Sequence, residues 1–213
     1  MNISKRLRTI TSFLNKDDII SDIGTDHGLV PIYHCLYNGA SKAYALDINI
    51  NPLKQAENNI SFYKVNVITK LSNGIENISD DCNTLVIAGM GNVTIESILM
   101  AHKEKLTNIN KMVIQSNTYS FTIRQLLNTL GYKIQDETVI YDKGKFYEID
   151  CFVKGEEILS SLEIKYGKYN LLKREKDFID KLKYDLNSKK RIYQSSKRQE
   201  VLNEINEIES LIK

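Results

Sequence analysis

Short runs of aliphatic and β-branched residues alternate with segments of helical periodicity over the first 153 residues. Five apolar runs end near Gly, Asp or Asn, at 19–24, 43–48, 65–71, 84–90 and 111–117. Such continuous runs predict strands that are buried on both faces of a parallel sheet. Helices are predicted between them at 31–37, 52–62, 93–102 and 119–130, with Asn51 as the cap of the second helix.

The pattern changes after Gly131, where strand-like runs at 132–141 and 145–153 flank the turn Asp142-Lys143-Gly144. A short turn containing glycine between two such runs predicts a β-hairpin, which brings the sheet to seven strands. An amphipathic helix is predicted within the first fourteen residues, because Ile3, Leu7, Ile10 and Leu14 follow helical spacing. The predicted fold class is therefore α/β, with a doubly wound, mostly parallel, Rossmann-like sheet of seven strands.

Residues 155–213 show apolar spacings of three and four and no strand pattern, which predicts a C-terminal α-helical coiled-coil hairpin with breaks at Gly167 and Ser195-Ser196. We therefore expect a first domain at 1–154 and a helical domain at 155–213. From Lys165 to Arg198 there are 12 Lys and Arg against 4 Asp and Glu, and an acidic stretch follows. Two interpretations remain open, namely helices paired through complementary charge and a basic surface that follows a nucleic-acid backbone.

The composition narrows the class of protein. The chain has 213 residues and a formal net charge of +2, so its overall charge does not by itself indicate a nucleic-acid-binding protein. No apolar run approaches the ~18 residues that span a bilayer, and the N-terminus lacks the apolar core of a signal peptide. The 3 cysteines form no C-x-x-C pair, which argues against a disulfide framework or a zinc site. We expect a cytoplasmic, metal-free monomer without membrane contact.

Polar residues and glycines follow the predicted strands and converge at their carboxyl ends. Asp22 and Gly24 end the first predicted strand and Gly28 follows it, without a G-x-G-x-x-G or phosphate-loop motif, which argues against a dehydrogenase. Asp47 ends the second strand roughly 20 residues later, where a carboxylate can bind both ribose hydroxyls. The residues expected to bind a nucleoside-like cofactor are Asp22, Gly24, Asp47, Ile48, Asn73, Gly74, Ala88, Gly89 and Met90.

The whole chain resembles the class I S-adenosylmethionine-dependent methyltransferases, and more closely the bacterial tRNA (adenine-22-N1)-methyltransferase family. The stretches that carry the resemblance are 4–7, 22–27 with Pro31, 87–91, Gln115 and Asn117 with 123–124, and 144–148. Four positions depart from the family pattern, namely Leu29, Asn73, Asn92 and Ser116.

The resemblance implies transfer of a methyl group from S-adenosylmethionine to N1 of adenine 22 in the tRNA D-arm, leaving S-adenosylhomocysteine. Adenine N1 carries an in-plane lone pair, so alignment rather than a strong general base supplies most of the rate. We expect the base pocket to be formed by Asp26, His27, Asn92 and Asn117. The target base must leave its base pair, which costs free energy of unpairing and unstacking. A basic arm that binds phosphates would offset that cost. The RNA-binding candidates are Lys5, Arg6, Lys173, Arg174, Lys189, Lys190 and Arg191.

Two alternatives to a tRNA methyltransferase remain at this stage. The first is a methyltransferase of small molecules or proteins on the same fold, for which a basic helical appendage would be superfluous. The second is a non-catalytic RNA-binding protein with a vestigial nucleotide pocket. The presence of both Asp22 and Asp47 argues against it.

Overall fold

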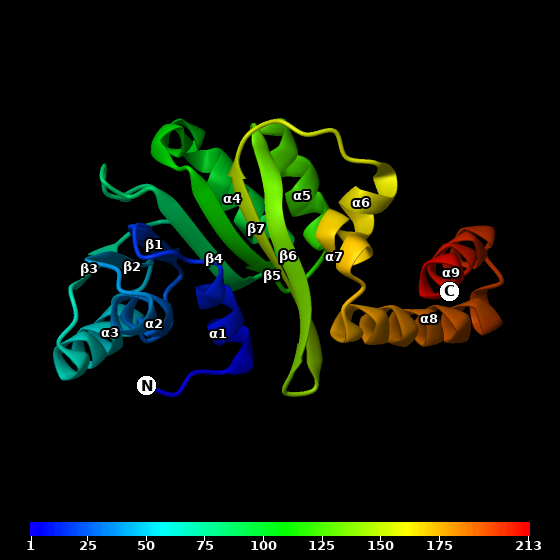
Figure 1. Ribbon diagram of the computed structural model, residues 1–213, viewed down its shortest axis with the longest axis horizontal. Coiled ribbons are helices and arrows are strands. Elements are labelled where there is room, and N and C mark those ends of the chain that lie inside the picture. Colours follow the sequence, from blue (N-terminus) through cyan, green and yellow to red (C-terminus); the bar gives the residue numbers. More distant parts are fainter.

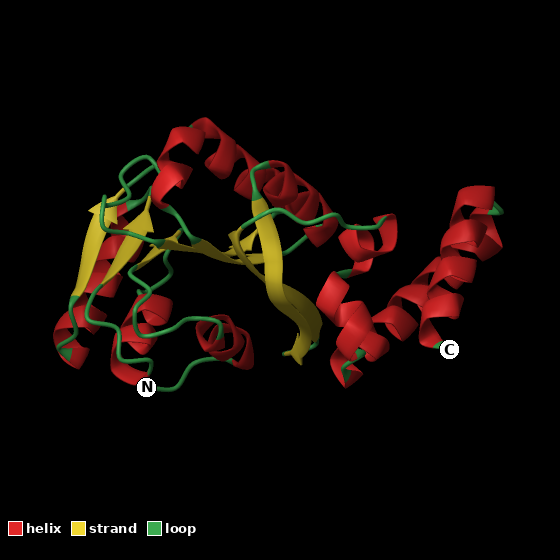
Figure 2. Ribbon diagram, turned by 45° about the horizontal axis from the view of Figure 1, so that its top comes forward, coloured by secondary structure: helices red, strands yellow, loops and turns green.

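The computed structural model describes residues 1–213 and contains one seven-stranded sheet with helices on both faces (Figures 1 and 2). The strand order is β3-β2-β1-β4-β5-β7-β6. The strands β1 to β5 pair in parallel, and β7 runs antiparallel to both β5 and β6. Their bounds are Ile20–Ile23, Ala43–Asp47, Val67–Leu71, Thr84–Met90, Lys111–Ser116, Tyr132–Asp142 and Lys145–Lys154. The predicted fold class is confirmed.

The helices of the sheet region begin close to their predicted positions, with one instructive difference. Their bounds are α1 Lys5–Ser12, α2 Leu29–Tyr37, α3 Ile50–Tyr63, α4 Asn92–Ala101 and α5 Ser120–Thr129, with a 3-10 turn at Lys103–Asn108. Both Pro31 and Pro52 occupy the third helical position rather than the first, and Asn49 precedes α3. The prediction of Asn51 as a cap was therefore wrong. The N–H groups of the first turn have no intrahelical partner, so proline fits anywhere in that turn.

Each face of the sheet has its own hydrophobic core. On one face α1, α2 and α3 pack through residues such as Ile10 and Val30. On the other face α4 and α5 pack through residues such as Ile95 and Ile123 (Figure 2). Because both faces are covered, the carboxyl edge of the parallel strands is the part of the sheet that is open to a ligand.

The C-terminal segment forms α6 (Ser161–Tyr166), α7 (Lys168–Lys173), α8 (Lys176–Ser196) and α9 (Gln199–Ile212). The long helices α8 and α9 form the expected hairpin, which extends away from the sheet in Figure 1. A third small core joins this hairpin to β6 through Val139, Phe178, Leu182 and Ile208. The short helices α6 and α7 pack against α5 and β6, so the tail is docked on the sheet region.

Arg124 on α5 is fully buried and contacts three carboxylates, a cluster for which the sequence pattern carried no signal. Its Nε donates to Glu137 at 3.0 Å, and its Nη2 donates to Glu148 at 3.0 Å and to Asp150 at 2.9 Å. Burial raises the pKa of Asp150 well above its usual value, although Arg124 acts in the opposite direction. The cluster joins α5 to β6 and β7, because Glu137 lies on β6 and the other two carboxylates lie on β7.

The same cluster also holds the beginning of the tail. Arg124 Nη1 donates to the carbonyl oxygen of Ile164 in α6 at 3.4 Å, and Glu137 Oε1 accepts the backbone N–H of Tyr169 in α7 at 2.6 Å. Between these two helices, Gly167 has φ +91°, and a Cβ there would lie 2.5 Å from Glu137 Oε2. Glycine is therefore required at the point where the tail crosses the cluster.

Replacing Arg124 by Met should lower the free energy of unfolding by about 3 to 5 kcal/mol, because it leaves the buried carboxylates of Glu137 and Asp150 without a cation. Urea denaturation at pH 7 measures this change. The matched control is Lys42→Ala, which removes the surface pair between Lys42 and Asp81 and should cost no more than about 1 kcal/mol. Equal losses in the two variants would contradict the structural role of the cluster.

Candidate active site

Two adjoining cavities lie at the carboxyl edge of the sheet and share Gly24. The first, here called the large edge cavity, has a volume of about 580 Å³. Its lining residues are Ile23, Gly24, Asp47, Ile48, Asn49, Ser72, Asn73, Gly74, Met90, Val93, Thr94, Ser97 and Ile98. The second, the small edge cavity, has a volume of about 60 Å³ and is lined by Arg6, Leu7, Asp22, Gly24, Asp26, Leu29, Val30 and Ala88.

The large edge cavity combines polar groups without partners and apolar walls. Asp47 Oδ1 accepts the backbone N–H of Asn49 at 2.7 Å, which leaves the second carboxylate oxygen free for a ligand. The side-chain amide of Asn73 offers a donor and an acceptor beside it. Ile48, 61% exposed, and Ile98 of α4 supply apolar surface. A free carboxylate, an amide and apolar walls in a cavity of this size fit a nucleoside.

Glycines shape the large edge cavity by allowing close approach of neighbouring side chains. Gly24 has φ +71°, and a Cβ there would lie 2.1 Å from Met90 Cε. Gly74 has φ +60°, and a Cβ there would lie 3.0 Å from Ile98 Cγ2. Neither position accepts a larger residue without displacing the wall of the cavity.

Asp22 is a buried carboxylate at the end of β1. It is 6% exposed, and it accepts a hydrogen bond from the Thr25 hydroxyl at 2.7 Å. Burial raises the pKa of Asp22 to about 6, against the lowering effects of Thr25 and of the nearby Arg6. At neutral pH the native protein therefore holds an ionised, buried carboxylate beside the small edge cavity. Its burial costs free energy, and it can attract an ammonium group there.

The structure brings most of the predicted cofactor residues to these two cavities. The large edge cavity receives Gly24, Asp47, Ile48, Asn73, Gly74 and Met90, and the small one receives Asp22, Gly24 and Ala88. Asp26, which was expected in the base pocket, also lines the small edge cavity. Gly89, the remaining cofactor candidate, and the other base-pocket candidates, His27, Asn92 and Asn117, line neither cavity. His27 lies next to the small edge cavity, because its Nε2 is 3.1 Å from Asp26 Oδ1.

Asn92 and Asn117 are held by hydrogen bonds within the protein. The Asn92 side chain donates to the Thr122 hydroxyl at 3.1 Å and accepts from the Thr118 hydroxyl at 2.8 Å. Asn117 donates from Nδ2 to the carbonyl oxygen of Gly89 at 2.7 Å. These amides fix the backbone at the end of β4 and the start of α4.

Two parts of the site were not predicted from the sequence. One wall of the large edge cavity comes from α4, where Ser97 and Ile98 follow Thr94 by three and four residues on one helical face. The spacing after Gly91 is the signal that could have identified this wall. The other part is Arg6, predicted as an RNA contact, whose Nη1 donates to Gln115 Oε1 at 2.6 Å and which lines the small edge cavity. Only the tertiary fold brings α1 to this place.

No helix in the structure is both long and apolar enough to cross a bilayer. No group of three or more His, Cys, Asp and Glu side chains is arranged to hold a metal ion.

A doubly wound sheet with a carboxylate at the end of β2 and a nucleoside-sized cavity at its carboxyl edge is the architecture of the class I methyltransferases. The methyltransferase domain family model matches residues 3–149. A Mycoplasma capricolum TrmK structure, solved in complex with S-adenosylhomocysteine, is 30% identical and has a TM-score of 0.84, and the match covers 99% of this chain and 97% of that chain. The chain belongs to the methyltransferase domain family and, within it, to the TrmK group.

Other relatives agree with this assignment. The Bacillus subtilis tRNA (adenine(22)-N(1))-methyltransferase is 32% identical over 152 residues, which is 70% of this chain and 64% of the relative. The solved structure of the Bacillus subtilis enzyme has a TM-score of 0.85 at 26% identity and covers 100% of this chain and 99% of that one. A Streptococcus pneumoniae protein solved with S-adenosyl-L-methionine has a TM-score of 0.93 at 27% identity, with both chains covered in full.

Replacing Asp22 by Asn should stabilise the protein at pH 7. The native state holds the Asp22 proton up to about pH 6, whereas the ordinary value is 3.8, so ionisation costs native-state free energy as the pH rises between these values. At about 1.4 kcal/mol per pKa unit, the gain from the variant is at most about 3 kcal/mol. Urea denaturation at pH 4 and pH 7 measures it. The gain should be present at pH 7 and absent at pH 4, and a loss of stability at pH 7 would refute this account.

Proposed function

We propose that the protein transfers a methyl group from S-adenosylmethionine to N1 of adenine 22 in tRNA. The observation that carries the proposal is the large edge cavity, in which Asp47 and Asn73 present unpartnered polar atoms between apolar walls. The relatives include a tRNA (adenine(22)-N(1))-methyltransferase and proteins solved with the methyl donor or its product.

The residues present fit S-adenosylmethionine. The free oxygen of Asp47 suits the ribose hydroxyls, Asn73 suits the adenine edge, and Ile48 and Ile98 suit the two faces of the adenine ring. Asp22, ionised at pH 7, suits the ammonium group of the methionine portion. When bound, S-adenosylmethionine supplies an electrophilic methyl group carried by a sulfonium.

The chain's own residues then hold the target base. Asp26, with its side chain 84% exposed beside the small edge cavity, accepts from the exocyclic amine of adenine and so presents N1. His27 orients the base next to it. Asn92 and Asn117 act as positioning residues, because their amides hold the backbone around Gly89 and α4. N1 needs no deprotonation before it attacks, so orientation accounts for most of the acceleration.

We propose that the basic tail holds the RNA backbone, with unequal contributions from its cations. Lys190 is paired with Glu209 at 2.6 Å, and Lys189 and Lys173 are paired with Glu204 and Asp136. Lys5 is similarly paired, with Asp177 at 2.8 Å, and Arg6 is used at the active site. Arg174 and Arg191 are exposed and form no ion pair, so they are the principal phosphate contacts.

Methyl transfer is tested with labelled S-adenosylmethionine, a tRNA transcript, and a transcript in which position 22 carries another base. We expect label in the first transcript alone, mapped to N1 of adenine 22. A protein that binds tRNA but transfers no label would be a non-catalytic RNA-binding protein. Transfer to metabolites or proteins with no transfer to tRNA would favour the other methyltransferases of this fold.

Replacing Asp47 by Ala should raise the Kd for S-adenosylmethionine about tenfold or more, because hydrogen bonds to a charged group contribute about 1.5 to 3 kcal/mol. Isothermal titration calorimetry measures this Kd. The control is Asp80→Ala, which removes a carboxylate outside both cavities and should leave the Kd unchanged. An unaffected Kd in the Asp47 variant would remove the ribose contact from the proposal.

Replacing Arg191 by Ala should weaken tRNA binding and reduce the slope of log affinity against log salt by about one for each phosphate that the side chain neutralises. The matched variant Lys190→Ala should have a smaller effect, because Lys190 is already neutralised by Glu209. Reversing the charges of Lys189, Lys190 and Arg191 together should weaken tRNA binding and leave cofactor affinity unchanged. Filter binding of tRNA from 50 to 200 mM salt, about the range in which such contacts weaken, measures the tRNA affinity and its salt slope. Unchanged slopes would assign the tail to packing alone.

A further inference from the structure

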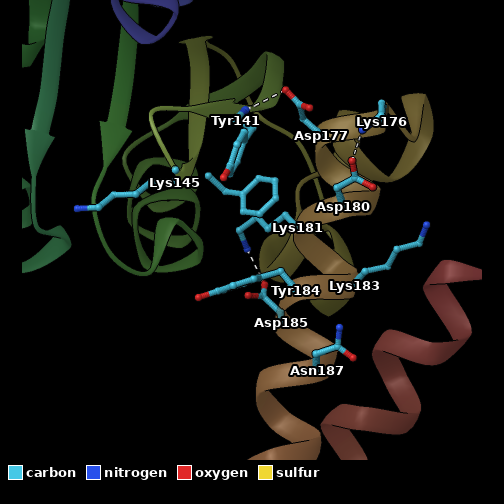
Figure 3. A pocket seen from close by; sticks show the side chains of 12 residues that line it. Tyr141, Lys145, Lys176, Asp177, Asp180, Lys181, Lys183, Tyr184, Asp185 and Asn187 are labelled. Atoms are coloured by element: carbon cyan, nitrogen blue, oxygen red, sulfur yellow. Dashed lines mark hydrogen bonds and ion pairs between the residues drawn. The ribbon is translucent and has the colours of Figure 1, made fainter.

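A groove that the methyltransferase site does not use lies between the β6–β7 hairpin and α8. This hairpin–α8 groove has a volume of about 770 Å³. Three aromatic rings line it, with centroids 4.9 Å apart for Tyr141 and Phe146 and 6.0 Å apart for Phe146 and Tyr184. Figure 3 shows Tyr141 and Tyr184 in this groove. Tyr184 is 63% exposed and Tyr141 is 48% exposed. Phe146, between them, is half-buried against the third core. Exposed aromatic rings such as those of Tyr184 and Tyr141 are surfaces on which unpaired bases stack.

The charges around the hairpin–α8 groove favour an anionic ligand. Its three aspartates are already engaged: Asp177 accepts from Lys5 at 2.8 Å, Asp185 accepts from Lys181 at 2.9 Å, and Asp180 pairs with Lys176. Lys145 and Lys183 form no ion pair. Figure 3 shows Lys145 on the hairpin side and Lys183 on the α8 side. Aromatic rings between two free lysines match a stacked base with a phosphate on either side.

The hairpin–α8 groove is connected to the active site through α1. The ladder between β5 and β7 ends at Ile114 and Asp150, so the hairpin continues past this point to its turn at Lys145. Two consecutive residues of α1 connect the two places. Lys5 donates to Asp177 in the groove, and Arg6 lines the small edge cavity while its backbone N–H donates to Asp142 at the hairpin turn at 3.0 Å.

We propose that the hairpin–α8 groove binds an unpaired nucleotide of the RNA substrate, with its base stacked on Tyr184 and its phosphates near Lys145 and Lys183. The proposal rests on the proposed function, since N1 of adenine lies on the Watson–Crick edge and is reached only after local opening of the RNA. Opening leaves neighbouring nucleotides unstacked. A stacking surface linked to the active site recovers part of the unstacking energy.

Replacing Tyr184 by Ala tests the stacking. Tyr184 is exposed within a long helix, and alanine has the highest helix propensity, so the variant should fold. The Kd for a tRNA transcript should rise about fivefold or more, as alanine substitution does at stacking sites. Tyr184→Phe keeps the ring and should keep the affinity. The salt slope should be unchanged in Tyr184→Ala and reduced in Lys183→Ala, and S-adenosylmethionine affinity should be unchanged in all three.

A fluorescence probe locates the nucleotide directly, because the chain contains no tryptophan. In Tyr184→Trp the single indole should be quenched by a tRNA transcript and by a short single-stranded oligouridine. The control is Phe62→Trp on α3, also exposed, at 76%, and outside the hairpin–α8 groove and both edge cavities; it should not be quenched.

The outcomes separate this proposal from the proposed function. Quenching by oligouridine together with loss of affinity in Tyr184→Ala supports the groove even if no methyl group reaches adenine 22. Methylation of adenine 22 with unchanged affinity in Tyr184→Ala overturns the groove and leaves the proposed function intact. A wild-type dimer that Tyr184→Ala dissociates, seen by light scattering, would also overturn it, because the groove would then be an interface between two copies.

Discussion

The guanidinium of Arg124 neutralises carboxylates inside the protein, and the position of the first two C-terminal helices, α6 and α7, depends on it. Glu137 and Asp150 are buried with it, and the carbonyl oxygen of Ile164 and the N–H of Tyr169 complete the hydrogen bonding. A buried ion pair contributes little net stability compared with apolar packing, but its geometry is demanding. The cluster therefore fixes where α6 and α7 lie, and the third core holds α8 and α9 against β6.

At the candidate active site, a buried carboxylate lacks such a partner. Asp22 has no cation in direct contact, and its raised pKa shows that burial works against ionisation. The protein retains a destabilising carboxylate at the one edge of the sheet where a cationic ligand can compensate it. Arg124 and Asp22 thus illustrate two uses of charge in one fold, since the first fixes the arrangement of elements and the second is available to a ligand.

Much of the fold could be predicted from the sequence, because buried parallel strands are continuous apolar runs and each is followed by a turn that ends at the same edge of the sheet. The candidate cofactor-binding residues were chosen by that rule, and Asp47, Asn73 and Met90 line one cavity. The residues expected to bind the target base were harder to predict in this way. Asn92 and Asn117 have the residue types of a polar pocket, but the structure shows their amides bonded to Thr122 and Gly89.

The sequence by itself determined the elements, their order and the carboxylates at the strand tips, because these depend on periodicity and on local turn chemistry. Tertiary structure decided which charges are free. The surplus of lysine and arginine in the tail is partly neutralised by α9, whose Glu204 and Glu209 meet Lys189 and Lys190. The tertiary structure also brings Arg6 of α1 to the small edge cavity and places Gly167 over the buried cluster. Such pairings join residues far apart along the chain, and no local pattern records them.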